Sequence, residues 1–172
     1  MARAARRALP ASPAIALPEE ARDGFNGLDF YPYDPALRVL AGVVAVDPES
    51  ARIGASSGLS IGFERFGRTC FELLGESRTL DLYWLAAYGG GVFLPFADST
   101  NGNQTYPAGR YLLDTVKGAD LGGVDGRLVL DFNFSYKPSC AYDSRWVCPL
   151  TPRANRLGVA IRAGERLPEH AL

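Results

Sequence analysis

The sequence contains a single histidine, His170, which lies among the last three residues of the chain. Chain ends are usually poorly ordered, so we expect no catalytic role for this imidazole. Its isolation argues against a Ser-His-Asp or Cys-His nucleophile system, a histidine-rich zinc site and a histidine general base. Any acid or base in this protein is therefore expected to be Asp, Glu, Tyr, Lys or Cys.

Cysteine is also scarce, with Cys70, Cys140 and Cys148 as the three thiols. Disulfide frameworks are usually found in smaller secreted chains with an even number of cysteines. A closed four-ligand zinc site would need a carboxylate in addition to three thiols, so we expect no metal, and no cofactor is predicted. Cys140 and Cys148 are assigned a structural role, either as buried thiols or as a disulfide that closes the loop between them. A reducing cytoplasm argues against the disulfide.

No charge of one sign dominates, since 18 Lys and Arg residues oppose 19 Asp and Glu residues, which gives a net charge of −1. This balance lacks the basic surface typical of nucleic-acid-binding proteins, so we expect no nucleic-acid partner. Long hydrophobic runs are absent as well. The longest, Leu37–Val46 and Leu82–Tyr88, are too short to cross a bilayer as a helix, so we expect no membrane association.

The first seven residues are basic, but prolines at positions 10, 13 and 18 interrupt the chain before the apolar core of a signal peptide forms. We therefore expect a cytoplasmic protein. The predicted organisation is a flexible extension at residues 1–18, one domain at residues 19–167 and a tail at residues 168–172. A chain of this length buries about 70% of its unfolded surface, which is enough for a single core.

Short β-branched and aromatic runs, separated by clusters of Gly and Asn, recur along the chain and predict strands. No helical pattern of ten residues lies between them, which argues against a parallel α/β sheet. The predicted fold is all-β, an antiparallel sandwich or barrel-like domain of about eight short strands, with long irregular loops and minimal helix. The predicted strands are Leu37–Val46, Gly58–Phe63, Thr69–Leu74, Thr79–Ala86, Val92–Phe96, Arg110–Asp114, Arg127–Phe134 and Leu157–Ile161.

Four uncommon sequence words occur in order. They are FNGLDFYPYDPALR from Phe25, FLPFADSTNGNQTYPAGRYL from Phe93, LDFNFSYKPSCAYDSRWVCPLTPRANRL from Leu130, and IRAGE from Ile161. Together they strongly resemble a bacterial and archaeal family of uncharacterised proteins, domain of unknown function 1684, and its actinobacterial members in particular. The resemblance extends from about residue 22 to residue 167. It implies no established activity.

The chain departs from the pattern of that family in two places. Members typically carry a longer N-terminal region with His-Pro and Ser-Pro, of which only Ser12 and Pro13 remain here, so the resemblance implies a shortened start. Many members have Glu at the position of Gln104. An amide does not transfer a proton usefully, so a glycosidase-like pair of carboxylates built on this position is not expected here.

The first candidate site is the polar loop at residues 98–110, between two predicted strands, where recognition groups are commonly displayed. Arg110 could bind a carboxylate or phosphate through its planar guanidinium, with hydroxyl hydrogen bonds from Thr100, Thr105 and Tyr106. The structural alternative is that Asp98 caps the turn and pairs with Arg110 while Tyr106 packs.

The second candidate site lies at the end of the predicted strand that carries Asp131 and Asn133. Side chains alternate across a strand, so these two residues share a face. The candidate site also includes Tyr136 and the loop that holds Cys140, Tyr142 and Cys148. Asp131 and Asn133 could orient a polar ligand or a water molecule, and Asn133 is a candidate ligand-binding residue. The alternative is a buried hydrogen-bond network that holds the next loop. Asn155 and Glu165 fit either interpretation and are assigned a structural role.

Two functional hypotheses follow from these residues. In the first, the domain binds a small polar or anionic metabolite in a pocket near Arg110. In the second, it is a histidine-free hydrolase or lyase in which Asp131 or Asp98 is the general base and Tyr106 or Tyr136 donates the proton. A purely structural or partner-binding role is a third alternative, because sheet edges often pair with other chains.

Overall fold

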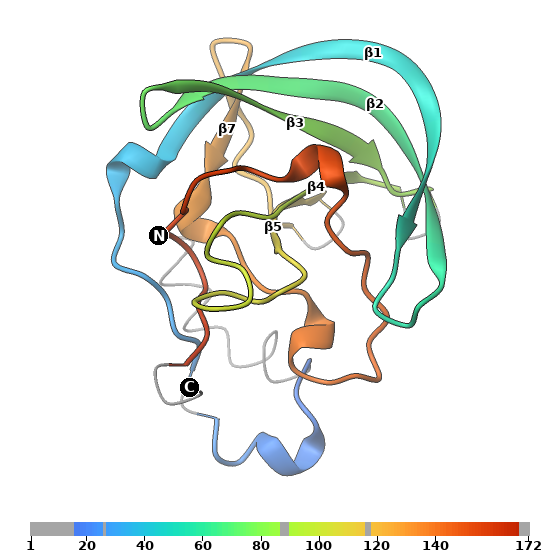
Figure 1. Cartoon of the computed structure of the whole chain (residues 1–172), viewed down its shortest axis with the longest axis vertical. Coiled ribbons are helices and arrows are strands. Elements are labelled where there is room, and N and C mark those ends of the chain that lie inside the picture. The colour runs from blue at the N-terminus through green and yellow to red at the C-terminus, as the bar shows by residue number, and fades with distance from the viewer. Residues whose placement is uncertain (1–15, 26, 87–89, 116–117, 169–172) are drawn as a thin grey trace.

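The computed structural model describes residues 16–25, 27–86, 90–115 and 118–168 (Figure 1). His170, Ser12 and Pro13 lie outside the described residues, as do most of the predicted extension and tail. Among the described helices, none has the length and apolar character needed to cross a membrane.

Seven antiparallel strands form one sheet in the order β5-β4-β3-β2-β1-β7-β6, which confirms the predicted all-β antiparallel fold. The helices that lie wholly within the described residues are single 3-10 turns. The strands are β1 (Arg38–Gly54), β2 (Ser60–Leu73), β3 (Glu76–Trp84), β4 (Val92–Phe96), β5 (Arg110–Asp114), β6 (Gly123–Val124) and β7 (Arg127–Asp131). The 3-10 turns are η1 (Glu19–Ala21), η2 (Pro35–Leu37), η5 (Phe132–Phe134), η6 (Ser139–Ala141) and η7 (Arg153–Asn155).

The sheet is strongly curved, with β1, β2 and β3 arching over β4 and β5 (Figure 1). Its β5 edge meets the chain that follows β7, because the backbone N–H of Tyr111 donates to Tyr136 O at 2.9 Å and the reverse bond measures 3.1 Å. This isolated bridge brings the β5 edge beside residues that follow β7, which is the strand next to the opposite edge of the sheet. The arrangement is barrel-like, and it places the loop after β4 close to the segments that follow β7.

Two of the predicted strands, Gly58–Phe63 and Thr69–Leu74, are parts of one strand, because both fall largely within β2. The predicted strand Leu37–Val46 is too short, because β1 continues to Gly54. The pairing of β1 with β2 shifts register between Ala45 and Glu49. Pro48 lies in this interval, and proline has no N–H to donate to a ladder, so a bulge is the expected accommodation. The pairing of β4 with β5 also shifts register, between Leu94 and Pro95, where a proline again has no N–H to donate.

The predicted strand Leu157–Ile161 is wrong, because this segment forms no ladder. It is held beside the end of β4 by separate bonds, from Leu157 N to Ala97 O at 2.7 Å and from Ser99 N to Val159 O at 3.0 Å. Leu157 and Ile161 are both buried. A short buried apolar run resembles a strand in sequence whether or not its backbone is paired.

The predicted strand Arg127–Phe134 is too long by three residues, because β7 ends at Asp131 and η5 follows. The Asp131 carboxylate caps this turn, since its Oδ1 accepts from Asn133 N at 3.0 Å. Asp is favoured at such positions because its short side chain reaches the backbone N–H two residues on. The turn redirects the chain toward the interior of the fold.

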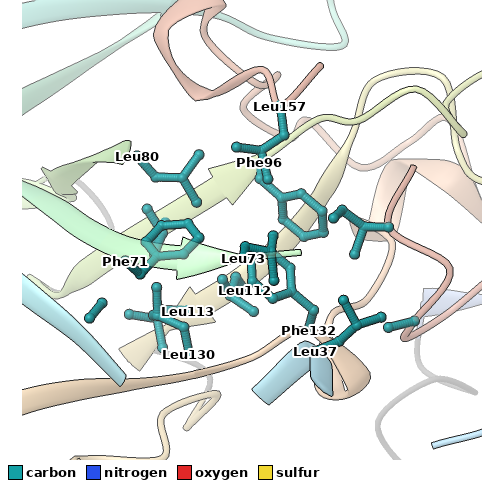
Figure 2. Close-up of a cluster of buried hydrophobic side chains, with 14 of the residues drawn as sticks. Leu37, Phe71, Leu73, Leu80, Phe96, Leu112, Leu113, Leu130, Phe132 and Leu157 are labelled. Atoms are coloured by element: carbon teal, nitrogen blue, oxygen red, sulfur yellow. The ribbon is translucent and has the colours of Figure 1, made fainter. Parts of the chain in front are cut away.

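The main core gathers buried apolar side chains from β2, β3, β4, β5 and β7 and from the segment after η7 (Figure 2). Phe132 is central, with its ring edge-to-face with Phe96 at 5.1 Å and tilted against Phe71 at 6.1 Å. Phe96 also lies 5.0 Å from the Arg110 guanidinium carbon, a cation–π contact. The core therefore packs directly against the first candidate site.

Candidate functional site

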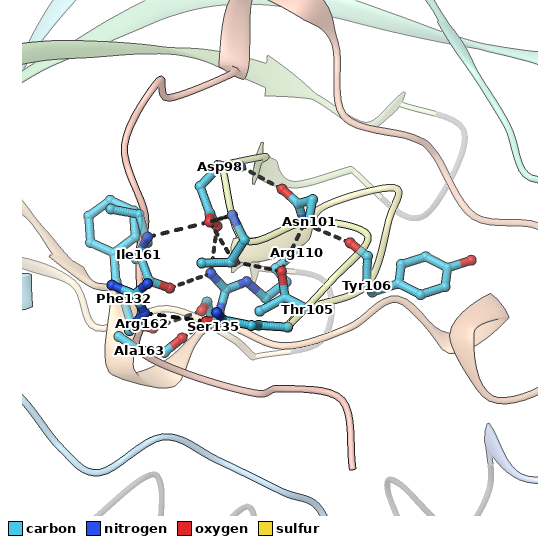
Figure 3. A network of polar contacts seen from close by, with 12 residues as sticks. Asp98, Asn101, Thr105, Tyr106, Arg110, Phe132, Ser135, Ile161, Arg162 and Ala163 are labelled. Atoms are coloured by element: carbon cyan, nitrogen blue, oxygen red, sulfur yellow. Dashed lines mark hydrogen bonds and ion pairs between the residues drawn. The ribbon is translucent and has the colours of Figure 1, made fainter. Parts of the chain in front are cut away.

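Arg110 begins β5 and is completely buried. Its Nη2 donates to Asp98 Oδ2 at 2.6 Å and to Ile161 O at 2.9 Å, while Nη1 donates to Ala163 O and to Glu165 O, the latter at 3.3 Å. Burial lowers the pKa of Arg110, and the neighbouring Asp98 carboxylate opposes that shift. Figure 3 shows the guanidinium directed toward the chain at residues 161–163. Arg110 thus joins β5 to the loop after β4 through a buried ion pair, and to the C-terminal segment through three carbonyls.

The second oxygen of Asp98 organises the polar loop. Asp98 Oδ1 accepts from Thr100 N at 2.8 Å and Thr100 Oγ1 at 2.5 Å, and the Thr100 and Thr105 hydroxyls lie 2.8 Å apart. Asn101 accepts from Asp98 N at 2.5 Å and donates to Tyr106 O at 2.6 Å. These bonds match the structural alternative for the loop. A ligand could bind the Thr100 and Thr105 hydroxyls only by displacing these internal hydrogen bonds.

Asp131 and Asn133 tie the end of β7 to the chain before η2. Asn133 accepts from Asp34 N at 2.9 Å and donates to Asp34 O at 2.7 Å and to Asp131 Oδ1 at 2.8 Å. Asp131 Oδ2 accepts from the Tyr33 hydroxyl at 3.2 Å and lies 4.0 Å from Arg38 Nε. Both polar side chains at the end of β7 are buried, so this group has the geometry of a network that anchors the N-terminal part of the domain.

The two predicted proton donors belong to separate groups. The Tyr136 hydroxyl donates to Asp114 Oδ2 at 3.2 Å, whereas the Tyr106 hydroxyl lies 3.7 Å from Cys140 Sγ. Figure 3 shows the Tyr106 ring pointing away from the Arg110 guanidinium. Within the described residues, the hydrogen bonds do not join the predicted bases, the predicted anion anchor and the two tyrosines into one catalytic set.

Glu165 and Asn155 each hold distant segments together from a fully buried position. Glu165 accepts from Lys137 N at 2.9 Å and from the Tyr142 hydroxyl, and it pairs with Lys137 Nζ at 3.2 Å. Asn155 accepts from Asp81 N at 2.8 Å and donates to Asp81 O at 2.9 Å and to a carbonyl of β4 at 2.8 Å. Over the described ranges, no group of three or more His, Cys, Asp or Glu side chains is arranged to hold a metal ion.

A group of accessible polar side chains lies close to the buried Arg110. Gln104 Oε1 accepts from the Tyr31 hydroxyl at 3.0 Å and from Arg162 Nε at 3.3 Å. The guanidinium carbon of Arg166 lies 5.8 Å from the centre of the Tyr31 ring. Arg162 is exposed, and the other three are partly exposed. Partial burial raises the pKa of Tyr31, and the positive charge of Arg110 opposes that shift. We call Tyr31, Gln104, Arg162 and Arg166 the arginine surface.

The Cys140 and Cys148 thiols are neighbours. Cys140 N donates to Cys148 Sγ at 3.3 Å, which places the Cys148 sulfur against the backbone of Cys140. Hydrogen bonding to Cys148 lowers the pKa of Cys140 to about 6, with partial burial opposing the shift and the Tyr106 hydroxyl adding to it. Burial, together with the same contact to Cys140, raises the pKa of Tyr106 to about 12. At neutral pH this arrangement favours a Cys140 thiolate beside a protonated Tyr106.

Comparison with known proteins identifies the family. Residues 23–166 match the family model described as protein of unknown function (DUF1684). The chain belongs to this family. A solution NMR structure of an uncharacterised protein from Haloarcula marismortui is 35% identical, covers 90% of this chain and 84% of its own, and superimposes with a TM-score of 0.65. No curated protein matches the chain. These findings confirm the predicted resemblance to the family, while the likeness to actinobacterial members stays a prediction.

Sequence reasoning missed several residues of this DUF1684 chain that the structure brings together. Lys137 was not predicted, although it pairs with Glu165 beside Tyr142, because it lies in an irregular segment where no periodicity marks it. Arg162 lies within the IRAGE word and Arg166 directly follows it, and this spacing of four residues is the one signal that could have drawn attention to them.

The position of Gln104 shows what the amide does in this DUF1684 chain. Its Oε1 accepts two hydrogen bonds, one from a phenol and one from a guanidinium. A carboxylate oxygen of Glu would accept the same two bonds, because both amide and carboxylate oxygens are acceptors. The role of this position in the present chain is therefore acceptance of hydrogen bonds.

Alkylation of Cys140 by iodoacetamide is expected to stay near its maximal rate as the pH falls toward 6, and to drop about tenfold per unit well below it, because the thiolate is the nucleophile. A lowered pKa keeps the thiolate dominant above about 6 and loses it as the pH falls through that value. Peptide mass spectrometry over a pH series measures the rate, and the exposed Cys70 serves as the reference thiol in the same sample.

The Tyr106→Phe variant is the matched control for this pH profile. It removes the hydroxyl that stabilises the thiolate and keeps the ring, so the midpoint for Cys140 is expected to move upward. A wild-type rate that still rises tenfold per unit above about pH 7 would contradict the lowered pKa.

Proposed function

We propose that this protein binds a small anionic metabolite, a carboxylate or a phosphate ester, on the arginine surface next to Arg110. The observation that carries the proposal is the pair of guanidinium groups of Arg162 and Arg166 around Tyr31 and Gln104. A guanidinium binds carboxylate and phosphate groups through parallel hydrogen bonds, and a phenol adds a further donor.

In this proposal Arg110 positions the site and does not contact the ligand. Its guanidinium binds the carbonyls of Ile161, Ala163 and Glu165, which are the direct neighbours in sequence of the two residues that carry the proposed contacts. Those carbonyl contacts fix the backbone of the segment, so less conformational freedom is lost when an anion binds. Such preorganisation contributes to affinity by reducing the cost of ordering the site.

The proposal predicts that Arg162→Ala and Arg166→Ala each weaken binding of the best anionic ligand by at least about tenfold, because each removes a charge-assisted hydrogen bond. A panel of phosphorylated and carboxylated metabolites is screened by thermal shift at low salt, and the best ligand is then measured by calorimetry. Arg153→Ala, which removes an exposed arginine of η7, is the matched control for a general loss of positive charge.

Two results would contradict the proposal. In the first, no anion of the panel stabilises the wild-type protein. In the second, Arg153→Ala weakens binding as much as Arg162→Ala does, which would mean that nonspecific attraction accounts for the effect.

The enzymatic alternative has less support. A general base needs a lone pair that can reach the substrate, and both oxygens of Asp98 and of Asp131 accept hydrogen bonds within the fold. Turnover of a substrate by the wild-type protein that is lost in both Asp98→Asn and Asp131→Asn would restore this alternative. A cytoplasmic location is part of our proposal, because reduced thiols at Cys140 and Cys148 need a reducing compartment.

A further inference from the structure

We propose that Cys140 and Cys148 form a peroxide-reactive thiol pair, in which Cys140 is oxidised first and Cys148 then closes a disulfide with it. The geometry that carries this inference is the direct contact between the two residues. Cys140 N donates to Cys148 Sγ at 3.3 Å, so the Cys148 sulfur lies against the residue that carries the other thiol. A disulfide would therefore join two residues that are already in contact.

The two thiols differ in their exposure, as expected for a pair in which one thiol is oxidised first and the other then closes the disulfide. Cys140 lies on η6 and is partly exposed, so a small oxidant can reach its sulfur, whereas Cys148 is buried. The Tyr106 hydroxyl, 3.7 Å from Cys140 Sγ, can donate to the thiolate. The lowered pKa of Cys140 supports its assignment as the attacking sulfur, because oxidation by peroxides proceeds through the thiolate.

The backbone around Cys148 keeps the second thiol in place. Cys148 N donates to Ser56 Oγ at 3.1 Å, and Ser56 N donates to Cys148 O at 3.0 Å. These bonds connect the thiol pair to the turn between β1 and β2. Cys148 is therefore the fixed partner, while Cys140 approaches it from a single 3-10 turn that is bounded by irregular chain.

The oxidation is a balanced two-electron reaction with hydrogen peroxide or an alkyl hydroperoxide as the oxidant. The Cys140 thiolate attacks one peroxide oxygen, the O–O bond breaks, and the leaving hydroxide or alkoxide takes up a proton. Cys140 is then a sulfenic acid. The Cys148 sulfur attacks Cys140 Sγ, the S–O bond breaks, and hydroxide leaves with the Cys148 proton as water. The two thiols lose two electrons and the peroxide gains them.

The test uses the purified full-length protein, one equivalent of hydrogen peroxide, alkylation of the remaining thiols and peptide mass spectrometry. The expected result is a peptide pair linked through Cys140 and Cys148, with Cys70 still alkylated. A dithiol reductant should reverse the link. Cys70 is an exposed thiol in the same chain, so it controls for oxidation that depends on accessibility alone.

Two variants separate the roles of the cysteines. In Cys148→Ser the sulfenic acid cannot be resolved, so a dimedone adduct is expected on Cys140. In Cys140→Ser neither a link nor an adduct is expected on Cys148. The proposal is overturned if wild-type Cys70 oxidises at least as fast as Cys140, or if Cys140 oxidises without forming the link. The wild-type measurement needs no substitution, so it decides the matter even if a variant fails to fold.

Discussion

Replacing Arg110 with alanine is expected to lower the free energy of unfolding by about 3–5 kcal/mol, because it leaves a buried carboxylate without its partner. The side chains of Arg110 and Asp98 are both completely buried, and their closest atoms are 2.6 Å apart. The substitution also removes the donors to three carbonyls of the C-terminal segment. Urea denaturation of the wild-type and variant proteins, followed by circular dichroism, measures the difference.

Two further variants make this prediction specific. Arg153→Ala removes an exposed arginine and is expected to change stability by less than about 0.5 kcal/mol. Arg110→Lys retains the charge but loses the planar guanidinium. Its loss of unfolding free energy should therefore lie between those of Arg153→Ala and Arg110→Ala. A loss below about 1 kcal/mol for Arg110→Ala would contradict a structural role. It would also make Arg110 a candidate for direct ligand contact again.

The role of Arg110 shows what the sequence could and could not decide. Pairing between Asp98 and Arg110 was one of two predicted outcomes, since turn chemistry and opposite charges within one loop suggest it. The carbonyls of Ile161, Ala163 and Glu165 lie about fifty residues further along the chain. No local pattern indicates that this segment returns to β5, so the choice between anchor and ligand contact required the fold.

The strands illustrate the same limit in a different way. Alternation of apolar side chains and the absence of helical periodicity were enough to predict an antiparallel all-β fold. They did not predict that η5 begins after Asp131, because this depends on a single carboxylate that caps the turn. Nor did they separate the unpaired Leu157–Ile161 segment from a strand, because burial makes both apolar.

The polar loop at residues 98–110 contributes one residue to the arginine surface, and a residue two positions later contacts the thiol pair. Thr105 separates Gln104, which accepts hydrogen bonds at the arginine surface, from Tyr106, which contacts Cys140. Asn101 donates to Tyr106 O at 2.6 Å, and Asp98 holds Arg110 beneath the C-terminal segment. One loop, whose side chains are held by internal hydrogen bonds, thus supports both the proposed anion site and the proposed thiol pair.

Replacing Gly164 with alanine is expected to destabilise the protein by about 2–4 kcal/mol, the combined cost of a strained backbone and overpacking. Gly164 has φ +72°, a conformation that L side chains rarely adopt. An added Cβ would lie 2.6 Å from Ser135 O and 2.7 Å from Phe132 O, and it would also meet Ser135 Oγ. Backbone oxygens cannot move aside as a flexible side chain can, so the segment itself would have to shift.

That shift connects stability to the proposed function, because Gly164 lies between Arg162 and Arg166. Displacing the segment would separate the two guanidinium groups from Tyr31 and Gln104, so Gly164→Ala is expected to weaken anion binding as well as folding. Gly158→Ala is the matched control, since an added Cβ there would meet no atom within 4 Å and its φ lies outside the left-handed region. Thermal denaturation and calorimetry on both variants measure the two effects. Equal losses of stability and of anion affinity in Gly164→Ala and Gly158→Ala would show that close packing at Gly164 does not hold the arginine surface in place.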